Sequence, residues 1–551
     1  MLPEPTVSVL GTDPSWRNCV LNGNAFQQDA IQSFNGWQYA CFYSTPRSSE
    51  LGDREPLYVH LSRRKLPIGK WETIVFEDYP QTTDDGHNTV QLGICPGDGT
   101  IHLSYDHHCD EIRYRHSIPN LATDPESHIW STEHFTATLH HLPGLEPSKP
   151  HAELLSYITY PRFGQLGPDL WFSFRTGKAG LGDDHLYLYS ASRGAYSSLS
   201  SSFPKLVGNN GVDNGIATPT TTTPFLKGVQ NNPYIHGLDA RNGVLYVTWV
   251  YRDFVWYDGW DDPADTKHKQ QAGPNSAANN RDLCFAYSSS SSSRPPLSSS
   301  SSSSPSKTAT AEEEDTTTSS LAGQVWRNGT GDVVADLRRG ESITPFSPGV
   351  TAFRIPKGAG LTNQEAQAVD HDGGVHVLNR DCYCHHQHHT QTKDDKDDDD
   401  NAANNNNREA VKWKHYYRDP VTKAWTSRAL PCGYVSGKRG RLAVSRDGDL
   451  YFVLPGVDNG LSIWKAAKWD AYRNYALVWS NGNNSYGEEE AFPLTEPLVD
   501  TYRLDHDNVL SVFTRRYAEA KKKRSHESAG NRQAGEKEER GVDVVVLDFQ
   551  L

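Results

Sequence analysis

Residues 84–108 read DDGHNTVQLGICPGDGTIHLSYDHH. The segments on either side of the Pro-Gly-Asp-Gly sequence at 96–99 have the composition of β-strands, and that sequence is typical of a tight turn. The stretch therefore predicts an antiparallel hairpin. Residues paired across a hairpin have numbers with a constant sum, here about 195, which would place His87 and His107 side by side at the open end.

The same signature, a turn followed by an aromatic or aliphatic strand, recurs along the chain. The seven copies are FNGWQYACFYS (34–44), GDGTIHLSYD (97–106), LGPDLWFSFR (166–175), ARNGVLYVTWVYR (240–252), HDGGVHVLNR (371–380), RDGDLYFVLPG (446–456) and HDNVLSVFTRR (506–516). Most copies begin roughly 60 to 75 residues after the previous one, which suits a four-stranded antiparallel sheet with its loops. We therefore predict an all-β chain folded as a seven-bladed β-propeller.

Both ends of the chain are strand-like, at residues 6–10 (TVSVL) and 542–549 (VDVVVLDF). Pairing them in one blade would close the ring and remove an exposed sheet edge. We therefore expect residues 1–551 to form a single propeller domain. Three low-complexity segments interrupt the strand pattern, at about 288–320, 391–408 and 519–540. They cannot supply a core, so we expect them to be loop insertions without regular structure.

Charge and hydropathy exclude several classes of partner. The chain has 54 Lys and Arg against 68 Asp and Glu, and no broad basic face that would indicate nucleic acid. No apolar stretch approaches the ~20 residues that span a bilayer. Eight cysteines in 551 residues do not make a disulfide scaffold. We expect a monomer that binds neither nucleic acid nor membrane.

A second polar pair is predicted in the next repeat. Residues 157–163 (YITYPRF) end one strand and residues 171–177 (WFSFRTG) form the next, so hairpin pairing would bring Tyr160 and Arg175 together. Propeller ligands bind where strand ends and loops converge over the central channel, and adjacent blades can share such a site. Imidazole, phenol and guanidinium groups together suit the processing of a uronate.

The segments that carry these residues resemble a known family. They are GWQYACFY, the 84–108 stretch, ITYPRF, FSFRTGKAGLGDDHLYLY, NGVLYVTWVYRD, NRDLCFAYS and LSVFTRR. They resemble the BNR-repeat propeller family, which includes ulvan lyases and fungal L-rhamnose-α-1,4-D-glucuronate lyases. The opening NGNAFQQDA (22–30) looks closest to the fungal enzymes. The resemblance implies a seven-bladed propeller whose catalytic residues match His87, His107, Tyr160 and Arg175.

The resemblance further implies β-elimination at a rhamnosyl-(1→4)-glucuronate linkage, as in gum arabic side chains. Such a lyase removes the C5 proton of glucuronate and expels O4, while a cation holds the carboxylate. Arg175 suits the role of this cation because its guanidinium group can bind a carboxylate through two hydrogen bonds. His107 is the first choice for proton transfer and Tyr160 the second, with His87 orienting the carboxylate. Further substrate contacts are expected from Asn88, His108 and Arg252.

Three alternatives stay open: an ulvan lyase, a sialidase-like glycoside hydrolase and a non-catalytic sugar-binding propeller. The hydrolase would need a carboxylate acid with a partner nucleophile, and no such pair accompanies the histidine hairpin so clearly. In every case the expected partner is an acidic polysaccharide or oligosaccharide. No signal peptide is visible, whereas this substrate class suggests an extracellular protein, so location is left open.

The expected chemistry needs no cofactor, and a structural metal is left open. Some ulvan lyases hold zinc on histidine and cysteine, and His236 could be one such ligand, although no complete set is visible around it. The cluster at 382–389 (CYCHHQHH) has the composition of a metal site but merges into an insertion. Arg439 lies between two repeats and could face the same cleft.

Overall fold

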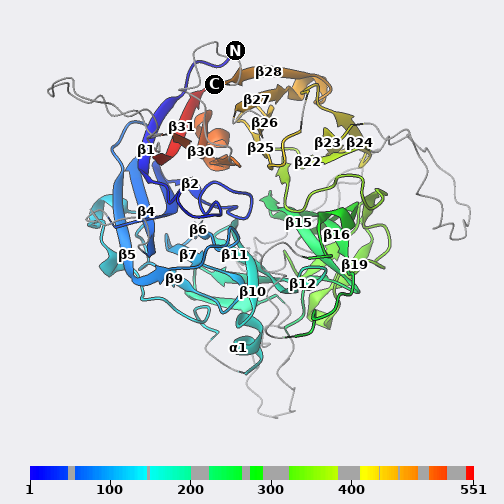
Figure 1. The fold of residues 1–551 in the computed structure, drawn as a ribbon, viewed down its shortest axis with the longest axis horizontal. Coiled ribbons are helices and arrows are strands. Elements are labelled where there is room, and N and C mark those ends of the chain that lie inside the picture. Colours follow the sequence, from blue (N-terminus) through cyan, green and yellow to red (C-terminus); the bar gives the residue numbers. More distant parts are fainter. Residues whose placement is uncertain are drawn as a thin grey trace, which may run out of the picture.

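The computed structural model describes residues 1–46, 56–145, 149–199, 222–262, 273–289, 322–382, 410–433, 435–456, 460–481, 496–517 and 541–551. Their strands form seven antiparallel sheets arranged around a common centre (Figure 1). The predicted seven-bladed β-propeller is confirmed.

The blades follow one another along the chain. The first consists of β2 (Ile31–Phe34), β3 (Trp37–Ser44), β4 (Leu57–Lys65) and β5 (Glu72–Gln81). The second consists of β6 (Val90–Ile94), β7 (Ile101–Tyr105) and β9 (Tyr114–His116). The third consists of β10 (Ile158–Leu166), β11 (Asp169–Lys178), β12 (Leu181–Ser190) and β13 (Ala195–Ser198), with β8 (His108–Asp110) and β14 (Leu226–Lys227) added beside β10 and β12.

The fourth blade consists of β15 (Asn231–Arg241), β16 (Val244–Asp253), β17 (Asn280–Ser289), β18 (Val325–Arg327) and β19 (Val333–Asp336), with β20 (Thr351–Phe353) on β17. The fifth consists of β21 (Ala366–Val369), β22 (Val375–Asp381), β23 (Lys412–Arg418) and β24 (Trp425–Ala429). The sixth consists of β25 (Arg441–Val444), β26 (Leu450–Pro455), β27 (Leu461–Ala466) and β28 (Tyr475–Ser480). The seventh consists of β29 (Leu498–Val499), β30 (Val509–Tyr517), β31 (Val542–Gln550) and β1 (Thr6–Thr12). The four-stranded plan is thus varied in the second, third and fourth blades.

The second strands of three blades are buried along their whole length. Every residue of β7, β22 and β26 is buried, polar residues included, whereas β24 near the outside contains no buried residue. This pattern follows from the ring, because both faces of each sheet are covered by neighbouring blades. Seven apolar clusters among the described residues join successive blades, and the last joins the seventh blade to the first.

Consecutive first strands, β2, β6, β10, β15, β21, β25 and β29, contact one another around the centre. The approach of β6 to β10 requires a glycine, since a Cβ on Gly93 would lie 2.6 Å from the Cγ of Phe163. In an antiparallel blade the first strand begins and the second strand ends at the same rim. The segment before β2, drawn in dark blue, bends over this central region (Figure 1).

The two ends of the chain meet in the seventh blade, as predicted. β1 pairs antiparallel with β31, from Thr6 opposite Asp548 to Thr12 opposite Asp543. The pairing covers an edge of β31 that would otherwise be open.

The predicted insertions lie almost wholly outside the described residues. In the first, at 288–320, Ser288 and Ser289 belong instead to the end of β17, and the Ser288 hydroxyl donates to the carbonyl of Val325. The segments at 391–408 and 519–540, and residues 383–389 of the Cys–His cluster, are not described. The helices that are described, α1 (Lys149–Leu155) and α3 (Thr501–Asp507) among them, are too short to cross a bilayer.

A buried ionic network joins the seventh blade to the first. Asp548 on β31 accepts from Arg64 of β4 at 2.5 Å and from Arg503 of α3 at 2.7 Å. All three side chains are buried. Removing the carboxylate would leave two buried guanidinium groups without their counter-charge.

We predict that Asp548→Ala lowers the free energy of unfolding by about 3–5 kcal/mol, the range for breaking a buried pair from one side. Asp507→Ala, at the exposed end of α3, serves as the matched control and should change it little. Denaturant unfolding of both variants measures the difference. Equal stabilities would show that the network does not hold the ring closed.

Candidate active site

One residue from each blade lies within the first four residues of its first strand or up to five residues before it, and contacts join these residues into a circle at one rim of the ring. They are Phe26, His87, Tyr160, Tyr234, Asn363, Arg439 and Glu496. Ring contacts link the first four in sequence: Phe26 to His87 at 4.1 Å, Phe26 to Tyr160 at 5.5 Å and Tyr160 to Tyr234 at 6.2 Å. Arg439 closes the circle by bonding to Asn363 and Glu496 and by lying 5.2 Å from the Phe26 ring.

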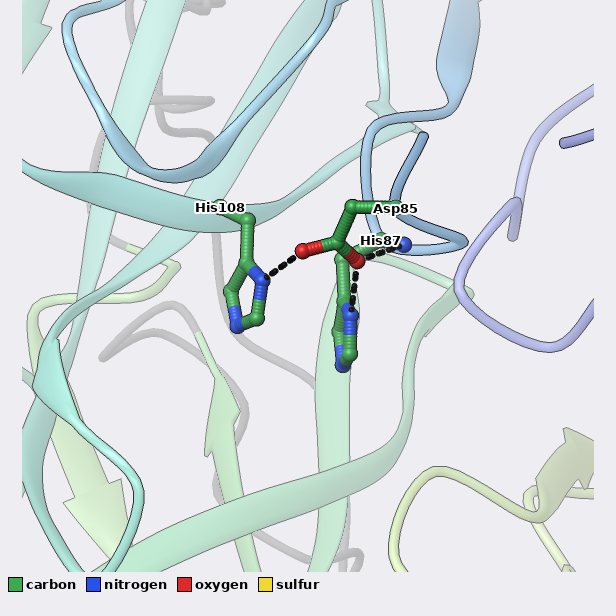
Figure 2. A group of neighbouring side chains, drawn as sticks. All are labelled: Asp85, His87 and His108. Carbon is green, nitrogen blue, oxygen red and sulfur yellow. Dashed lines mark hydrogen bonds and ion pairs between the residues drawn. The ribbon is translucent and has the colours of Figure 1, made fainter. Parts of the chain in front are cut away.

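Two stacked imidazoles share one carboxylate in this circle (Figure 2). Asp85 places one oxygen 2.7 Å from Nδ1 of His87 and the other 2.6 Å from Nδ1 of His108. The two rings stack at 3.8 Å, tilted by 19°, and Phe26 covers the other face of His87. In Figure 2 both Nε2 atoms lie at the ring edge turned away from Asp85.

The predicted partner of His87 is therefore corrected from His107 to His108. The hairpin register holds as far as Val90 opposite Tyr105. Beyond it, Asp106 and Cys109 adopt left-handed backbone angles, with φ of 66° and 59°, which end the regular alternation. His107 is buried elsewhere in this turn, and its Nε2 accepts a hydrogen bond from the Arg113 backbone N–H at 2.8 Å.

The surroundings fix the protonation of this cluster. Burial raises the pKa of Asp85, but the hydrogen bonds from His108 and His87 outweigh burial and hold its pKa well below the usual value. Burial, with His87 alongside, lowers the pKa of His108 to about 3. An ionised Asp85 can only accept hydrogen bonds, so the Nδ1 atoms of His87 and His108 are the donors in these two bonds.

Tyr160 lies on a β-bulge. The register of β10 against β11 shifts between Thr159 and Arg162, and Tyr160 within the shift has a φ of 57°. A tyrosine in this backbone region is strained, and bulges commonly redirect a side chain near a functional site. The bulge brings the Tyr160 ring to 5.7 Å from His87 and to 4.8 Å from the guanidinium carbon of Arg175. The structure thus brings Tyr160 and Arg175 together, but through the bulge rather than through the predicted pairing, because Arg175 is opposite Thr159 in the register.

Arg175 and Arg252 meet at a residue that the sequence analysis missed. Both donate to the hydroxyl of Tyr234, each at 3.2 Å. Arg252 also donates to the side-chain oxygens of Asn280 and Asn363, each at 2.8 Å. Both arginines are buried.

Neither guanidinium has a carboxylate partner among the described residues. Asp184 is opposite Arg175 in the strand register, but burial raises the pKa of Asp184 to about 8, so it is largely neutral at pH 7. Two buried positive charges without a counter-ion are costly unless an anion binds them. The arrangement therefore suits a planar anionic group such as a carboxylate.

The remaining predicted residues are less central. Asn88 is buried and donates to Asp106 at 2.8 Å, a contact that supports the hairpin end. His236 uses both ring nitrogens within the protein, toward the Glu365 N–H at 3.2 Å and the Asn379 amide at 3.1 Å, which leaves neither for a metal.

Asp85, His87 and His108 are the only group of described residues close enough to hold a metal ion together. The ligand types suit zinc. However, the distances of 2.6 and 2.7 Å between oxygen and Nδ1 are those of direct hydrogen bonds, so an ion would have to displace both bonding protons.

Sequence reasoning missed Asp85, Tyr234 and Asn363. Asp85 was within the hairpin stretch, two residues before His87, and that spacing was the available signal. Tyr234 and Asn363 come from blades four and five, and only the closed ring brings them to Arg252.

The family model described as a BNR repeat-containing family member matches residues 37–303 and 306–431, more than half of the chain. The chain belongs to this family. Among solved structures, the polysaccharide lyase Uly1 aligns with a TM-score of 0.58 at 16% identity, over 98% of this chain and 97% of that one. At this identity the likeness establishes the fold.

Two other propellers align more distantly. A fucose-specific lectin from Aleuria aurantia has a TM-score of 0.34 at 8% identity, over 85% of this chain and 100% of the lectin. A Trypanosoma rangeli sialidase has a TM-score of 0.35 at 11% identity, over 99% of this chain and 58% of the sialidase. No curated protein sequence matches the chain significantly.

We predict that His108 stays neutral at pH 5, where an imidazole in an unfolded chain is mostly protonated. Its folded-state pKa of about 3 lies below the unfolded value, so its contribution to stability is present above about pH 6.5 and is lost as the pH falls toward 3. Nitrogen NMR of the protein with labelled histidine should show, for His108, a protonated Nδ1 and an unprotonated Nε2. A charged His108 at pH 5 would contradict this description of the cluster.

Proposed function

We propose that the protein is a polysaccharide lyase that cleaves a rhamnosyl-(1→4)-glucuronate linkage by β-elimination, giving rhamnose and an unsaturated glucuronate end. The observation that carries the proposal is the juxtaposition of Arg175 and Arg252, which have no carboxylate partner among the described residues, with two stacked imidazoles that Asp85 orients. The fold-level likeness to Uly1, itself named a polysaccharide lyase, agrees with this proposal.

Arg175 and Arg252 would bind the glucuronate carboxylate. Removal of the C5 proton pushes negative charge into that carboxylate, so groups that neutralise it stabilise the transition state more than the ground state. Tyr234 holds the two guanidinium groups on either side of its hydroxyl, which orients them before the substrate arrives. Because the two guanidinium groups are already oriented, the protein does not have to reorient them during the reaction, which lowers the free-energy barrier.

His87 is the better placed of the two imidazoles to take the C5 proton. Its side chain is 21% exposed, against 4% for His108. The proton would arrive on Nε2, and the Asp85 carboxylate on Nδ1 would stabilise the resulting imidazolium. His108 stacks on the same ring and remains neutral, because its pKa is about 3, so it would not repel that charge. The contact between His107 and the Arg113 backbone makes His107 a supporting residue in this scheme.

Tyr160 would assist departure of O4. Burial raises the pKa of Tyr160 well above its usual value, with Tyr234 adding to the effect, so the phenol keeps its proton at neutral pH and can donate it. In glucuronate the C5 hydrogen and O4 lie on the same side for elimination. A base and an acid set close together, as His87 and Tyr160 are at 5.7 Å, therefore suit this linkage.

Glycoside hydrolysis is less well supported by the same residues. It needs one carboxylic acid that donates a proton and a second carboxylate. Asp85 has a pKa held well below its usual value by the two histidines that bond to it. Glu496 bonds to Arg439 at 3.2 Å. Burial raises the pKa of Glu496, but the charge of Arg439 and the backbone hydrogen bonds from Ala25 and Arg439 together outweigh burial and lower it. Neither of these two carboxyl groups is protonated at neutral pH, and Asp184, the carboxyl group beside Arg175 that is largely protonated, is buried with an exposed fraction of 6%.

Incubation with gum arabic and, separately, with ulvan tests the proposal. We expect gum arabic to give free rhamnose together with the ultraviolet absorbance of a conjugated unsaturated uronate. Absorbance with ulvan alone would overturn the assigned linkage but keep the elimination. Released sugar without absorbance would indicate hydrolysis, and the absence of both signals would indicate a binding protein.

We predict that His87→Ala lowers kcat/KM by about 10²–10⁴-fold, the range for a general acid–base group, without a large change in Tm. His140→Ala is the matched control, since His140 is exposed and forms an ion pair with the exposed Glu111. Rates and thermal unfolding should be measured together. Retention of most activity in His87→Ala would remove His87 from the proton-transfer step.

A further inference from the structure

An aromatic cluster stands on the segment that follows β16 and takes no part in the site described above. Phe254, Trp256 and Trp260 have ring centroids between 4.9 and 6.4 Å apart. Trp256 is 60% exposed, and the neighbouring Val255 is also exposed. A tryptophan held against two other rings but open to solvent on one side offers a preformed apolar surface.

The cluster is anchored to the strands that carry the two arginines. The side chain of Asn275 accepts from the N–H of Val255 at 2.6 Å and donates to the carbonyl of Val255 at 3.0 Å, while the backbone carbonyl of Asn275 accepts from Arg252 at 3.2 Å. On the other side, the Lys178 ammonium donates to the Trp260 carbonyl at 2.9 Å and lies 5.3 Å from that ring.

These anchors set the separation between the cluster and the arginines. Lys178 follows Arg175 on β11 by three residues, about 10 Å along an extended strand. Phe254 follows Arg252 by two residues at the end of β16. An oligosaccharide that placed a uronate on the arginines could therefore place a nearby sugar of the same chain on the cluster.

The charges around the cluster are opposite to those of the arginine site. Asp258, Asp261 and Asp262 are exposed on the same segment, and Lys178 is a described basic residue that contacts Trp260. Within a Debye length of about 8–10 Å, carboxylates repel a sulfate or a second uronate. The cluster therefore suits an uncharged sugar.

We propose that Phe254, Trp256 and Trp260 form a second subsite, the aromatic platform, that stacks on the apolar face of a neutral pyranose in the same chain as the uronate. This inference rests on the proposed function for the substrate class but concerns different residues. The C–H face of a pyranose gains dispersion contacts on a flat aromatic ring. The platform thus selects polysaccharides whose uronate has uncharged neighbours over sulfated ones.

Kinetics on two lengths of substrate test the aromatic platform. A rhamnosyl-glucuronate disaccharide is too short to reach it, whereas an oligosaccharide that continues into neutral galactose residues is not. Trp256→Ala should raise KM on the longer substrate by about three- to tenfold, the worth of one aromatic stacking contact, with kcat unchanged and no effect on the disaccharide.

Trp469→Ala is the matched control, because Trp469 is a tryptophan of another blade that is 87% exposed. It should behave like the unsubstituted protein on both substrates. A Trp256→Ala variant that also behaves like the unsubstituted protein, or that loses equally on both lengths, would overturn the aromatic platform.

Equilibrium binding gives a readout independent of turnover. A neutral galactose trisaccharide should bind and quench tryptophan fluorescence, Trp256→Ala should weaken that binding, and a sulfated form of the trisaccharide should bind more weakly. Equal affinity for the neutral and sulfated sugars would overturn the assigned selectivity. If the trisaccharide binds through Trp256 but the protein has no lyase activity, the aromatic platform stands and the proposed function is overturned. If the protein has lyase activity but no such binding, the proposed function stands and the aromatic platform is overturned.

Discussion

The geometry of an antiparallel blade governs the whole site. The first strand of each blade begins, and the second strand ends, at one rim of the ring. Side chains from all seven blades therefore lie at the same rim of the ring, from Phe26 before β2 to Glu496 before β29. Closure of the ring by β1 on β31 and by the Asp548 network keeps these starting points in register around the circle.

Within that circle the charges are segregated. The Asp85 carboxylate lies between two imidazoles and holds their Nδ1 atoms, while Arg175 and Arg252 are held by neutral oxygens such as the Tyr234 hydroxyl. Buried guanidinium groups supported in this way retain their positive potential for a ligand, because no carboxylate among the described residues bonds to them. Burial meanwhile keeps His108 neutral, and in the proposed mechanism the more exposed His87 is the base. A site with these two halves can attract an acidic sugar and remove a proton from it.

The architecture could be predicted because the repeated strand signature is local. Each copy is nearly continuous in apolar and aromatic residues, as expected for strands covered on both faces, and the two strand-like ends of the chain pointed to closure. The hairpin register was also predicted as far as Val90 opposite Tyr105.

The site could be predicted only in part. Pairing residues by the constant sum of their numbers assumes an extended chain, so the prediction failed beyond Tyr105. The left-handed backbone of Asp106 turns the chain there, and His108 rather than His107 lies beside His87. Asp85 was overlooked because an acid in a turn is usually solvated, and its role emerges only when two histidines converge on it. Tyr234 had no sequence signal, since its importance depends on two arginines from different blades meeting at one hydroxyl.

The central claim is that the bond breaks by elimination rather than by hydrolysis. Mass spectrometry of the products formed in water enriched in heavy oxygen tests this claim directly, because water is a reactant only in hydrolysis. The account predicts a uronate product lighter by one water than the hydrolysis product and carrying no heavy oxygen. A saturated uronate that keeps O4, formed together with rhamnose that carries heavy oxygen at C1, would contradict it.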